Sequence, residues 1–313
     1  MLCFCKILFF CYTSNPRYDI ISLSAKGVCY MDASAYYFTG EPDFSIGKAK
    51  RANVHFVSDS HYHNTYEIYY LVSGTRRQFV DHTIYDMKKG DLILIPKGSI
   101  HKTTAIVKNP HTRYLINFSE EYAESIFRDM GESSVKKVFD TVIIGIPESR
   151  QEYILSLFER IEEEYCDRKS DEYADAMIKN YLAELFVFIL RYNKRKSKGD
   201  ILAEIPEKEI QTAARFVYEN YDKEITLSKV ADYVHMSESY FSKKFKSVTG
   251  LNFSEYLVST RMKRAEELLL STSKSITEIA ELCGFSDANY FGDVFKKRRG
   301  VSPNKYRRFK GRM

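Results

Sequence analysis

The chain has 313 residues, and its hydrophobic content of 44% suits a folded protein of two domains rather than a disordered or fibrous one. The formal net charge of +5 is unevenly distributed. Residues 239–313 hold 16 Lys and Arg against 7 Asp and Glu, a net charge of +9, so the other 238 residues sum to −4. A basic end on a mildly acidic body indicates a polyanionic partner for that end, although a merely solvated charged surface is the simpler alternative.

Cysteine usage and the apolar start argue against secretion. The six cysteines are Cys3, Cys5, Cys11, Cys29, Cys166 and Cys283, and no CxxC pair indicates a zinc ribbon or a redox motif. A reducing, cytoplasmic compartment fits this usage. The start MLCFCKILFFCY is too short to span a bilayer and makes a poor signal peptide, so no membrane partner is expected. Residues 1–40 are poorly patterned, residues 1–30 are expected to contribute little to the fold, and Met31 is a candidate for the natural start.

Residues 41–120 read as short strands broken by turns. Segments such as YEIYYLVSG, RRQFVD and LILIPKG are rich in β-branched and aromatic residues. Turn signals at Gly74, Gly90 and Gly98 recur at intervals typical of an all-β barrel or sandwich.

The apolar period changes to three or four residues over 121–195. One series runs through Ile154, Leu157, Phe158, Ile161 and Tyr165, and a second runs through Met177, Ile178, Tyr181, Leu182, Leu185, Phe186, Ile189 and Tyr192. These series predict two amphipathic helices joined by a turn near Ser170. Their apolar face needs a partner, and we weigh packing on the β domain equally with a dimer seam. Residues 196–206 read as a linker before a final helical domain over 207–313.

The strongest signal is an internal repeat in this last domain. The segment SKVADYVHMSESYFSKKFKSVTGLNFSEYL, residues 228–257, is matched by TEIAELCGFSDANYFGDVFKKRRGVSPNKYR, residues 277–307. Each copy has the pattern of a helix-turn-helix. A small residue in the first helix, an N-cap serine, two phenylalanines at i and i+4 and a closing glycine recur as Ala231, Ser237, Phe241, Phe245 and Gly250, and as Ala280, Ser286, Phe291, Phe295 and Gly300.

This repeat resembles the DNA-binding domain of the AraC/XylS family of bacterial transcription regulators, in which a long helix joins two helix-turn-helix units. The linking helix corresponds to TGLNFSEYLVSTRMKRAEELLLSTSKSI. The resemblance covers about a third of the chain and implies that the second helix of each unit enters a major groove of double-stranded DNA.

Candidate DNA-contacting residues follow by position. On the first recognition helix the groove-facing residues are Glu238, Ser239, Ser242, Lys243 and Lys246. On the second they are Asp287, Asn289, Gly292 and Asp293. Residues assigned to phosphates are Lys296, Lys297, Arg298, Arg299 and Arg307. For each lysine the alternative is ordinary surface charge. Asp293 adds repulsion near phosphates, so the second unit is expected to read fewer bases than the first.

The stretch HYHNTYEIYYLVSG, residues 61–74, raises a separate question. On one strand the odd-numbered residues His61, His63, Glu67 and Tyr69 share a face, with an apolar face behind them. Together with GDLILIPKGSIH, residues 90–101, the stretch resembles the cupin pattern. That resemblance implies a small barrel in which His61, His63, Glu67 and His101 could ligate a metal. The pattern departs from the family at Ala105, where Asn is usual, and in lacking an upstream glycine.

A cupin-like barrel ahead of an AraC-type domain is the arrangement of many sugar-responsive regulators in that family. The resemblance implies a sensor pocket in which His61, His63, Glu67, Tyr69 and His101 bind an effector, and an organic ligand without a metal is favoured over a divalent cation. The alternative function is a metal-dependent cupin enzyme or metal sensor fused to a DNA-binding module. The sequence shows no second catalytic constellation and no nucleotide-binding glycine loop, so we expect no enzyme activity.

The combined expectation is a multidomain α+β protein. It comprises a cupin-like barrel, a helical hairpin and an all-α double helix-turn-helix domain. The expected function is cytoplasmic transcription regulation, with DNA and a sugar-like effector as partners. A homodimer, and contact with RNA polymerase if the protein is an activator, follow from the resemblance.

Overall fold

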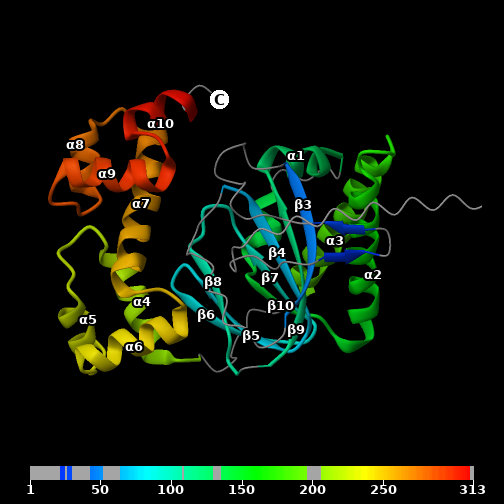
Figure 1. The fold of residues 1–313 in the computed structure, drawn as a ribbon, viewed down its shortest axis with the longest axis horizontal. Helices are drawn as coiled ribbons and strands as arrows, with labels where there is room; N and C mark the ends of the chain where they lie inside the picture. The colour runs from blue at the N-terminus through cyan, green and yellow to red at the C-terminus, as the bar shows by residue number, and fades with distance from the viewer. Residues whose placement is uncertain are drawn as a thin grey trace, which may run out of the picture.

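The computed structural model describes residues 22–24, 27–29, 43–51, 64–107, 109–129, 135–195 and 206–310. The candidate start at Met31 and all but the last residue of the expected linker, 196–206, lie outside the described residues. The described chain forms a β domain flanked by helices and a separate all-α lobe at the C-terminal end (Figure 1). The α+β architecture expected from the sequence is therefore confirmed.

Two antiparallel sheets build the β domain. The larger sheet has the strand order β10-β7-β4-β9-β3 and the smaller has the order β6-β5-β8. Their strands are β3 (Phe44–Arg51), β4 (Tyr66–Ser73), β5 (Thr75–Val80), β6 (Thr83–Lys88), β7 (Asp91–Ile95), β8 (His101–Thr104), β9 (His111–Phe118) and β10 (Ile143–Gly145). The turns expected at Gly74, Gly90 and Gly98 all have positive φ, which glycine adopts without strain.

A short strand pair precedes this barrel. Strands β1 (Ser22–Ser24) and β2 (Gly27–Cys29) are antiparallel and pair only with each other. Because this hairpin joins neither of the two larger sheets, the expectation that residues 1–30 contribute little to the fold stays a prediction. Three-residue strands are too short to produce a detectable alternation of apolar and polar residues.

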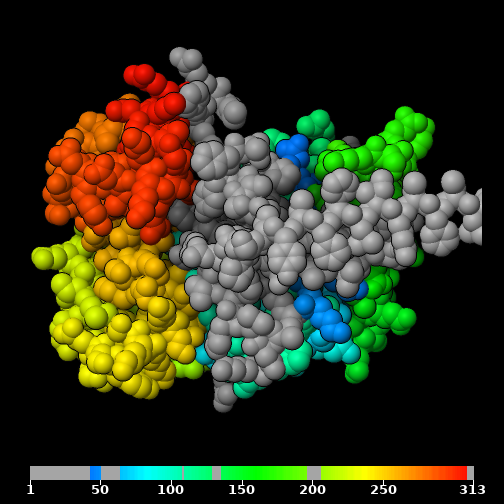
Figure 2. Space-filling view, in the orientation of Figure 1, coloured from blue at the N-terminus to red at the C-terminus, as the bar shows by residue number. Residues whose placement is uncertain are grey.

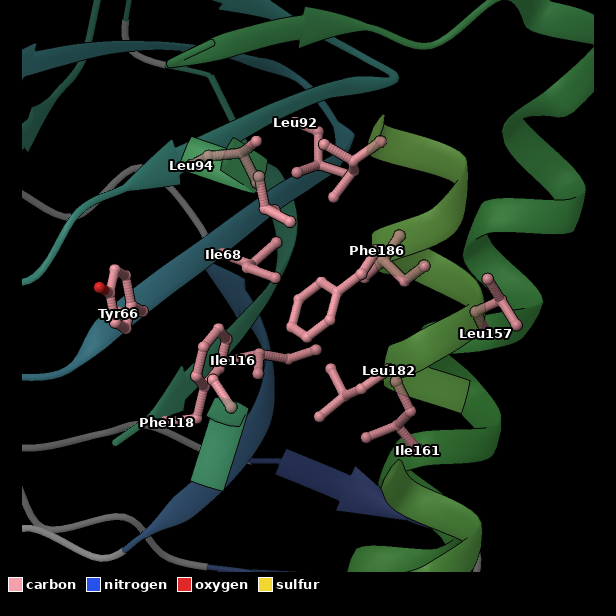
Figure 3. Packing of buried hydrophobic residues seen from close by; sticks show 14 of the residues in the cluster. Tyr66, Ile68, Leu92, Leu94, Ile116, Phe118, Leu157, Ile161, Leu182 and Phe186 are labelled. Atoms are coloured by element: carbon pink, nitrogen blue, oxygen red, sulfur yellow. The ribbon is translucent and has the colours of Figure 1, made fainter. Parts of the chain in front are cut away.

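Helices cover the outer face of the larger sheet. They are α1 (Glu120–Asp129), the 3-10 helix η2 (Val135–Asp140), α2 (Glu148–Asp167) and α3 (Ala174–Arg195). Helices α2 and α3 are the predicted hairpin. Figure 3 shows Phe186 of α3 pointing at Ile68 and Ile116 of the sheet, and all three side chains are fully buried. Packing on the β domain thus accounts for the apolar face, and a dimer seam is not needed to bury it.

The C-terminal lobe contains seven helices among the described residues. They are α4 (Lys208–Asn220), α5 (Leu227–Tyr233), α6 (Glu238–Thr249), α7 (Phe253–Ser271), α8 (Ile276–Leu282), α9 (Ala288–Arg299) and α10 (Pro303–Lys310). The first unit is built from α5 and α6 and the second from α8 and α9, while α7 joins them (Figure 1). No helix in the described ranges is long and apolar enough to cross a bilayer.

Helix ends largely follow the repeat. Gly250 and Gly300 occupy the left-handed C-cap position of α6 and α9, with φ of 76° and 72°, as predicted. Ser237 is the N-cap of α6, also as predicted. The N-cap expected at Ser286 is wrong. Asp287 caps α9 instead, and its carboxylate accepts hydrogen bonds from the backbone N–H groups of Asn289 and Tyr290, because one residue is inserted in the second turn.

The lobe has two hydrophobic cores, and the first is shared with the barrel. Phe291 and Phe295 lie in a core confined to the second unit and its supporting helices. Phe241 and Phe245 lie in a core that also contains three buried residues of the smaller sheet and its adjoining loop, Phe79, Ile84 and Ile100. The barrel therefore packs directly on the first helix-turn-helix unit.

Candidate effector site and nucleic-acid interface

Strand alternation sorts the residues of β4 into two cores. Ile68 and Tyr70 belong to the core beneath α2 and α3, whereas Tyr69 and Leu71 belong to a separate cluster between the two sheets. Glu67 lies on the same inward face, opposite Asn117 of β9. The alternation predicted for this strand is confirmed, and its odd-numbered residues line the barrel interior.

Glu67 and His101 meet inside the barrel. The side chains come from the two different sheets, and His101 Nε2 lies 3.6 Å from Glu67 Oε2. Both side chains are only 8% exposed. The Nδ1 atom of His101 lies 2.9 Å from the carbonyl oxygen of Ser99, which favours a proton on that nitrogen. Burial opposes the charged imidazolium, but the negative charge and hydrogen bond of Glu67 outweigh it, so the pKa of His101 is raised above its usual value.

The Glu67→Gln variant should lower the pKa of His101, because burial would then act without the opposing carboxylate. A raised folded-state pKa stabilises the protein below the unfolded value of about 6.5. That contribution is lost as pH rises through the raised pKa. NMR titration of the imidazole should give a lower midpoint in Glu67→Gln. Between pH 6 and pH 9, the free energy of unfolding should decrease less in Glu67→Gln than in the wild type. An unchanged midpoint would contradict the ion pair.

The structure adds interior polar groups that the sequence analysis missed. Gln78 of β5 is fully buried, and neither polar atom of its amide has a hydrogen-bond partner in the described part of the chain. The Oδ1 atom of Asn117 is likewise buried and unpaired there. Arg113 of β9 lies over the ring of Tyr69, with its guanidinium carbon 5.1 Å from the ring centroid. Inward alternation from the TRYLINF and RRQFVD segments could have identified these residues.

The predicted metal ligands are only partly described. His61 and His63 lie outside the described residues, so their predicted roles stay untested. Glu67 and His101 contact each other directly, which uses the carboxylate as the counter-charge of the imidazole. Among the described residues no group of three or more His, Cys, Asp or Glu side chains is arranged to hold a metal. A complete cupin ligand set would therefore need both His61 and His63.

The predicted groove-facing residues of the first unit share one exposed face of α6. Phe241 and Phe245 anchor the opposite face in the shared core. The exposed residues are Glu238, Ser239, Ser242, Lys243 and Lys246. Docking of the barrel on the first unit thus leaves this face open, and base reading by it stays a prediction.

The second unit exposes fewer of its predicted groove-facing side chains than the first. Asn289, Asp293, Lys296 and Lys297 of α9 are exposed. A Cβ atom added at Gly292 would meet nothing within 4 Å, so the helix backbone can approach a ligand closely there. Asp287, predicted to face the groove, is exposed and is also the N-cap of α9. Figure 2 shows the two units stacked along one edge of the molecule, the first in yellow and the second in orange and red.

Several arginines predicted to bind phosphates also make contacts within the lobe, and their binding to phosphates stays a prediction. Arg299 of α9 forms a bidentate ion pair with Glu266 of α7, with N–O distances of 2.5 and 2.9 Å. Arg298 donates to the hydroxyl of Ser259 at 2.8 Å. Arg307 of α10 donates to backbone carbonyl oxygens at the end of α7 and beyond it. These contacts fix α9 and α10 on the linking helix.

Lys297→Ala and Arg299→Ala should therefore have different effects. Loss of the exposed Lys297 should lower the salt dependence of DNA binding by about one charge equivalent and leave folding intact. Loss of Arg299 removes the bidentate ion pair of the largely buried Glu266 carboxylate and should lower the melting temperature. Fluorescence anisotropy at several salt concentrations and thermal unfolding separate the two. A reduced salt slope in Arg299→Ala with normal stability would show that this side chain also contacts phosphate.

The β domain with its helices and the C-terminal lobe each match a known protein family. Residues 42–186 match the AraC-like ligand binding domain, and residues 230–308 match a helix-turn-helix domain. The Lactose operon transcription activator of Staphylococcus xylosus is 29% identical over 71% of this chain and 76% of its own length. The Msm operon regulatory protein of Streptococcus mutans is 25% identical over 78% of this chain and 84% of its own. The C-terminal domain of the response regulator AraT from Geobacillus stearothermophilus is 37% identical, covering 35% of this chain and 88% of that one, with a TM-score of 0.32.

Proposed function

Because the chain belongs to the AraC family of transcription regulators, we propose that its barrel senses a carbohydrate-like effector and thereby controls DNA binding by the paired helix-turn-helix units. The relatives that match most of the chain are named as regulators, so the metal-dependent enzyme considered as an alternative is set aside. One observation carries the proposal. Strand β5 has one face in the barrel interior and the other face in the core of the first unit.

The two faces of β5 alternate residue by residue. Gln78 and Val80 point into the barrel, and Val80 lies in the interior cluster. Phe79, between them, points outward, and its ring contacts that of Tyr256 on α7 with centroids 5.3 Å apart. Gln78 is the chain neighbour of Phe79. A ligand that displaces Gln78 in the barrel is therefore expected to disturb the contact between Phe79 and Tyr256. A ligand shifts an equilibrium between two conformations only if it binds one of them more tightly, and a change in packing at Phe79 would provide that difference.

Polar contacts around Phe79 fix the position of the barrel relative to the C-terminal lobe. Lys263 of α7 binds the carboxylate of Asp81 at 3.0 Å. The side-chain oxygen of Gln211 on α4 accepts from the backbone N–H of Ile84 at 3.1 Å. These partners come from both ends of the β5–β6 turn, so a displacement of that turn would be felt by α4 and α7 together.

The carbohydrate assignment rests on the interior side chains and on the relatives. Amide, imidazole and carboxylate groups suit a ligand rich in hydroxyls, since each can donate to or accept from one. The names of two relatives refer to operons, one of them for lactose. We further propose a homodimer that spans paired half-sites, and contact with RNA polymerase when bound DNA lies upstream of a promoter.

Fluorescence anisotropy on the DNA upstream of the protein's own gene tests the proposal. The titration is run with the full chain, without addition and with neutral sugars (lactose, D-galactose or D-glucose) or acidic ones (D-glucuronate or D-glucose 6-phosphate) at millimolar concentration. The proposal expects sequence-specific binding that weakens with salt, and a shift in affinity of about 5- to 150-fold with a recognised sugar. Binding without salt dependence, or an affinity indifferent to every sugar and to the charged probes described below, would contradict it.

A further inference from the structure

One end of the barrel interior carries two arginines. Arg76 of β5 is 8% exposed, and its guanidinium donates to the carbonyl oxygens of Thr75 and Asn109, to the side-chain oxygen of Asn109 and to His111. Burial lowers the pKa of Arg76, and the positive charge of Arg113 lowers it further. Two like charges therefore lie close enough to repel each other.

Only neutral groups surround these two charges in the described part of the barrel. Arg76 is held by carbonyls, an amide and a histidine ring, and Arg113 stacks on Tyr69. Neither arginine forms an ion pair with a described Asp or Glu. Arg76 is buried and Arg113 is partly exposed. A buried cation without a counter-charge is costly, so two neighbouring guanidinium groups that have no carboxylate partner among the described residues favour a bound anion. Guanidinium groups match carboxylates and phosphates in both charge and geometry.

Polar groups flank the apolar cluster of the barrel interior, and they differ between its two ends. Arg113 lies opposite Leu71, and Asn117 lies opposite Glu67, four residues away on the same face of β4. This separation corresponds to about 13 Å. Gln78 lies between the ends, two positions along β5 from Arg76. The arginine end is cationic, whereas the Glu67–His101 end is a neutralised pair that can exchange hydrogen bonds.

We propose that the effector is an acidic, hydroxyl-bearing small molecule. Its carboxylate or phosphate binds Arg113 and is also attracted by the nearby positive charge of Arg76. Its hydroxyls contact the unpaired amide of Gln78 and the unpaired Oδ1 atom of Asn117, and reach toward the Glu67–His101 pair. The proposal rests on the proposed function, because it names the ligand class of the same barrel. It predicts a neutral sugar to be a poor effector, since a neutral ligand adds no negative charge beside the two guanidinium groups, which no described carboxylate neutralises.

Thermal unfolding and isothermal titration calorimetry test the anion site directly. The probes are inorganic phosphate, D-glucuronate, D-glucose 6-phosphate and D-glucose, with ionic strength matched by sodium chloride. At least one of the three anions should raise the melting temperature of the wild type more than D-glucose does. Arg113→Gln should lose this rise and bind the anion about 10- to 100-fold more weakly, because a charge-assisted hydrogen bond is removed. The carboxylate and phosphate probes distinguish the two sources of charge.

Two further variants, Arg113→Lys and Arg160→Gln, serve as controls. Arg113→Lys retains the charge and should retain part of the anion response, which a purely structural role of Arg113 would not produce. Arg160 of α2 also lies over a tyrosine ring, at 5.8 Å from the centroid of Tyr181, but on the exposed surface. Arg160→Gln should therefore respond as the wild type does. Without anion, Arg113→Gln should melt at or above the wild-type temperature, since like-charge repulsion is relieved.

The proposal is overturned if none of the three anions stabilises the wild type more than D-glucose does. It is equally overturned if Arg113→Gln keeps the full anion response. Either result would leave the proposed function standing wherever a neutral sugar still shifts DNA affinity. Loss of both the anion response and any sugar response in DNA binding would remove the proposed function as well.

Discussion

The Phe79→Ala variant should unfold in two separate transitions where the wild type unfolds with the barrel and the first helix-turn-helix unit coupled. Phe79 is fully buried, yet its neighbours are mainly residues of the C-terminal lobe, including Tyr256. Removing a buried phenylalanine side chain costs about 3–5 kcal/mol. Most of this loss falls on the interface between the two parts rather than on the interior of either. Differential scanning calorimetry or urea unfolding followed by tyrosine fluorescence measures it.

Phe118→Ala provides the matched control. Phe118 is also fully buried, but it lies in the core between the larger sheet and α1–α3. Its loss should lower the stability of the barrel by a similar amount and leave DNA affinity at low temperature unchanged. A Phe79→Ala protein that still unfolds in step with Phe118→Ala, and binds DNA with an unaltered sugar response, would contradict a role for Phe79 in coupling.

Gly250→Ala should cost more stability than the same change at Gly300, although both glycines close a recognition helix. Each has a left-handed φ near 75°, where an alanine costs roughly 1 kcal/mol. At Gly250 a Cβ atom would also lie 2.9 Å from Lys102 Cδ and from Thr104 Cγ2 on β8 of the barrel. The lysine chain can move aside, whereas the threonine methyl is held by a strand. Overpacking of this kind adds about 1–3 kcal/mol.

Gly300→Ala isolates the conformational part of that cost, because a Cβ atom there meets nothing within 4 Å. The difference in free energy of unfolding between the two variants therefore reports the contact between α6 and the barrel. Equal losses in the two variants would mean that the barrel does not press on the first unit in solution. The hydrogen bond from the Thr104 hydroxyl to the carbonyl of Val248, at 3.2 Å, is expected to break in Gly250→Ala alone.

The double helix-turn-helix was predictable because its signals are local. Phenylalanines four residues apart and a closing glycine define a helix, its buried face and its end without any long-range information. The capping error at Ser286 came from aligning the two copies strictly, since the inserted residue moved the cap to Asp287. The roles of Arg298 and Arg299 could not be read from sequence. A basic cluster looks the same whether it faces DNA or an acidic residue more than thirty positions away.

The effector site was only partly predictable for a related reason. Motif spacing identified Glu67 and His101, and the structure brings these two together from separate sheets. Gln78 and Asn117 match no motif, and their burial follows from strand register across the two sheets. The shared core around Phe79 was missed entirely, because an apolar residue on a strand gives no sign of which domain it will contact.

Hydrogen–deuterium exchange on the full chain, with and without DNA from upstream of its own gene, tests the central claim most directly. If effector binding in the barrel controls DNA affinity, then DNA must change the stability of the barrel by the same free energy. We predict altered amide exchange in β5, residues 75–80, when DNA binds, while β3 (Phe44–Arg51), at the far edge of the larger sheet, is unaffected. Protection confined to the helices of the C-terminal lobe, with β5 unchanged, would contradict coupling through this strand.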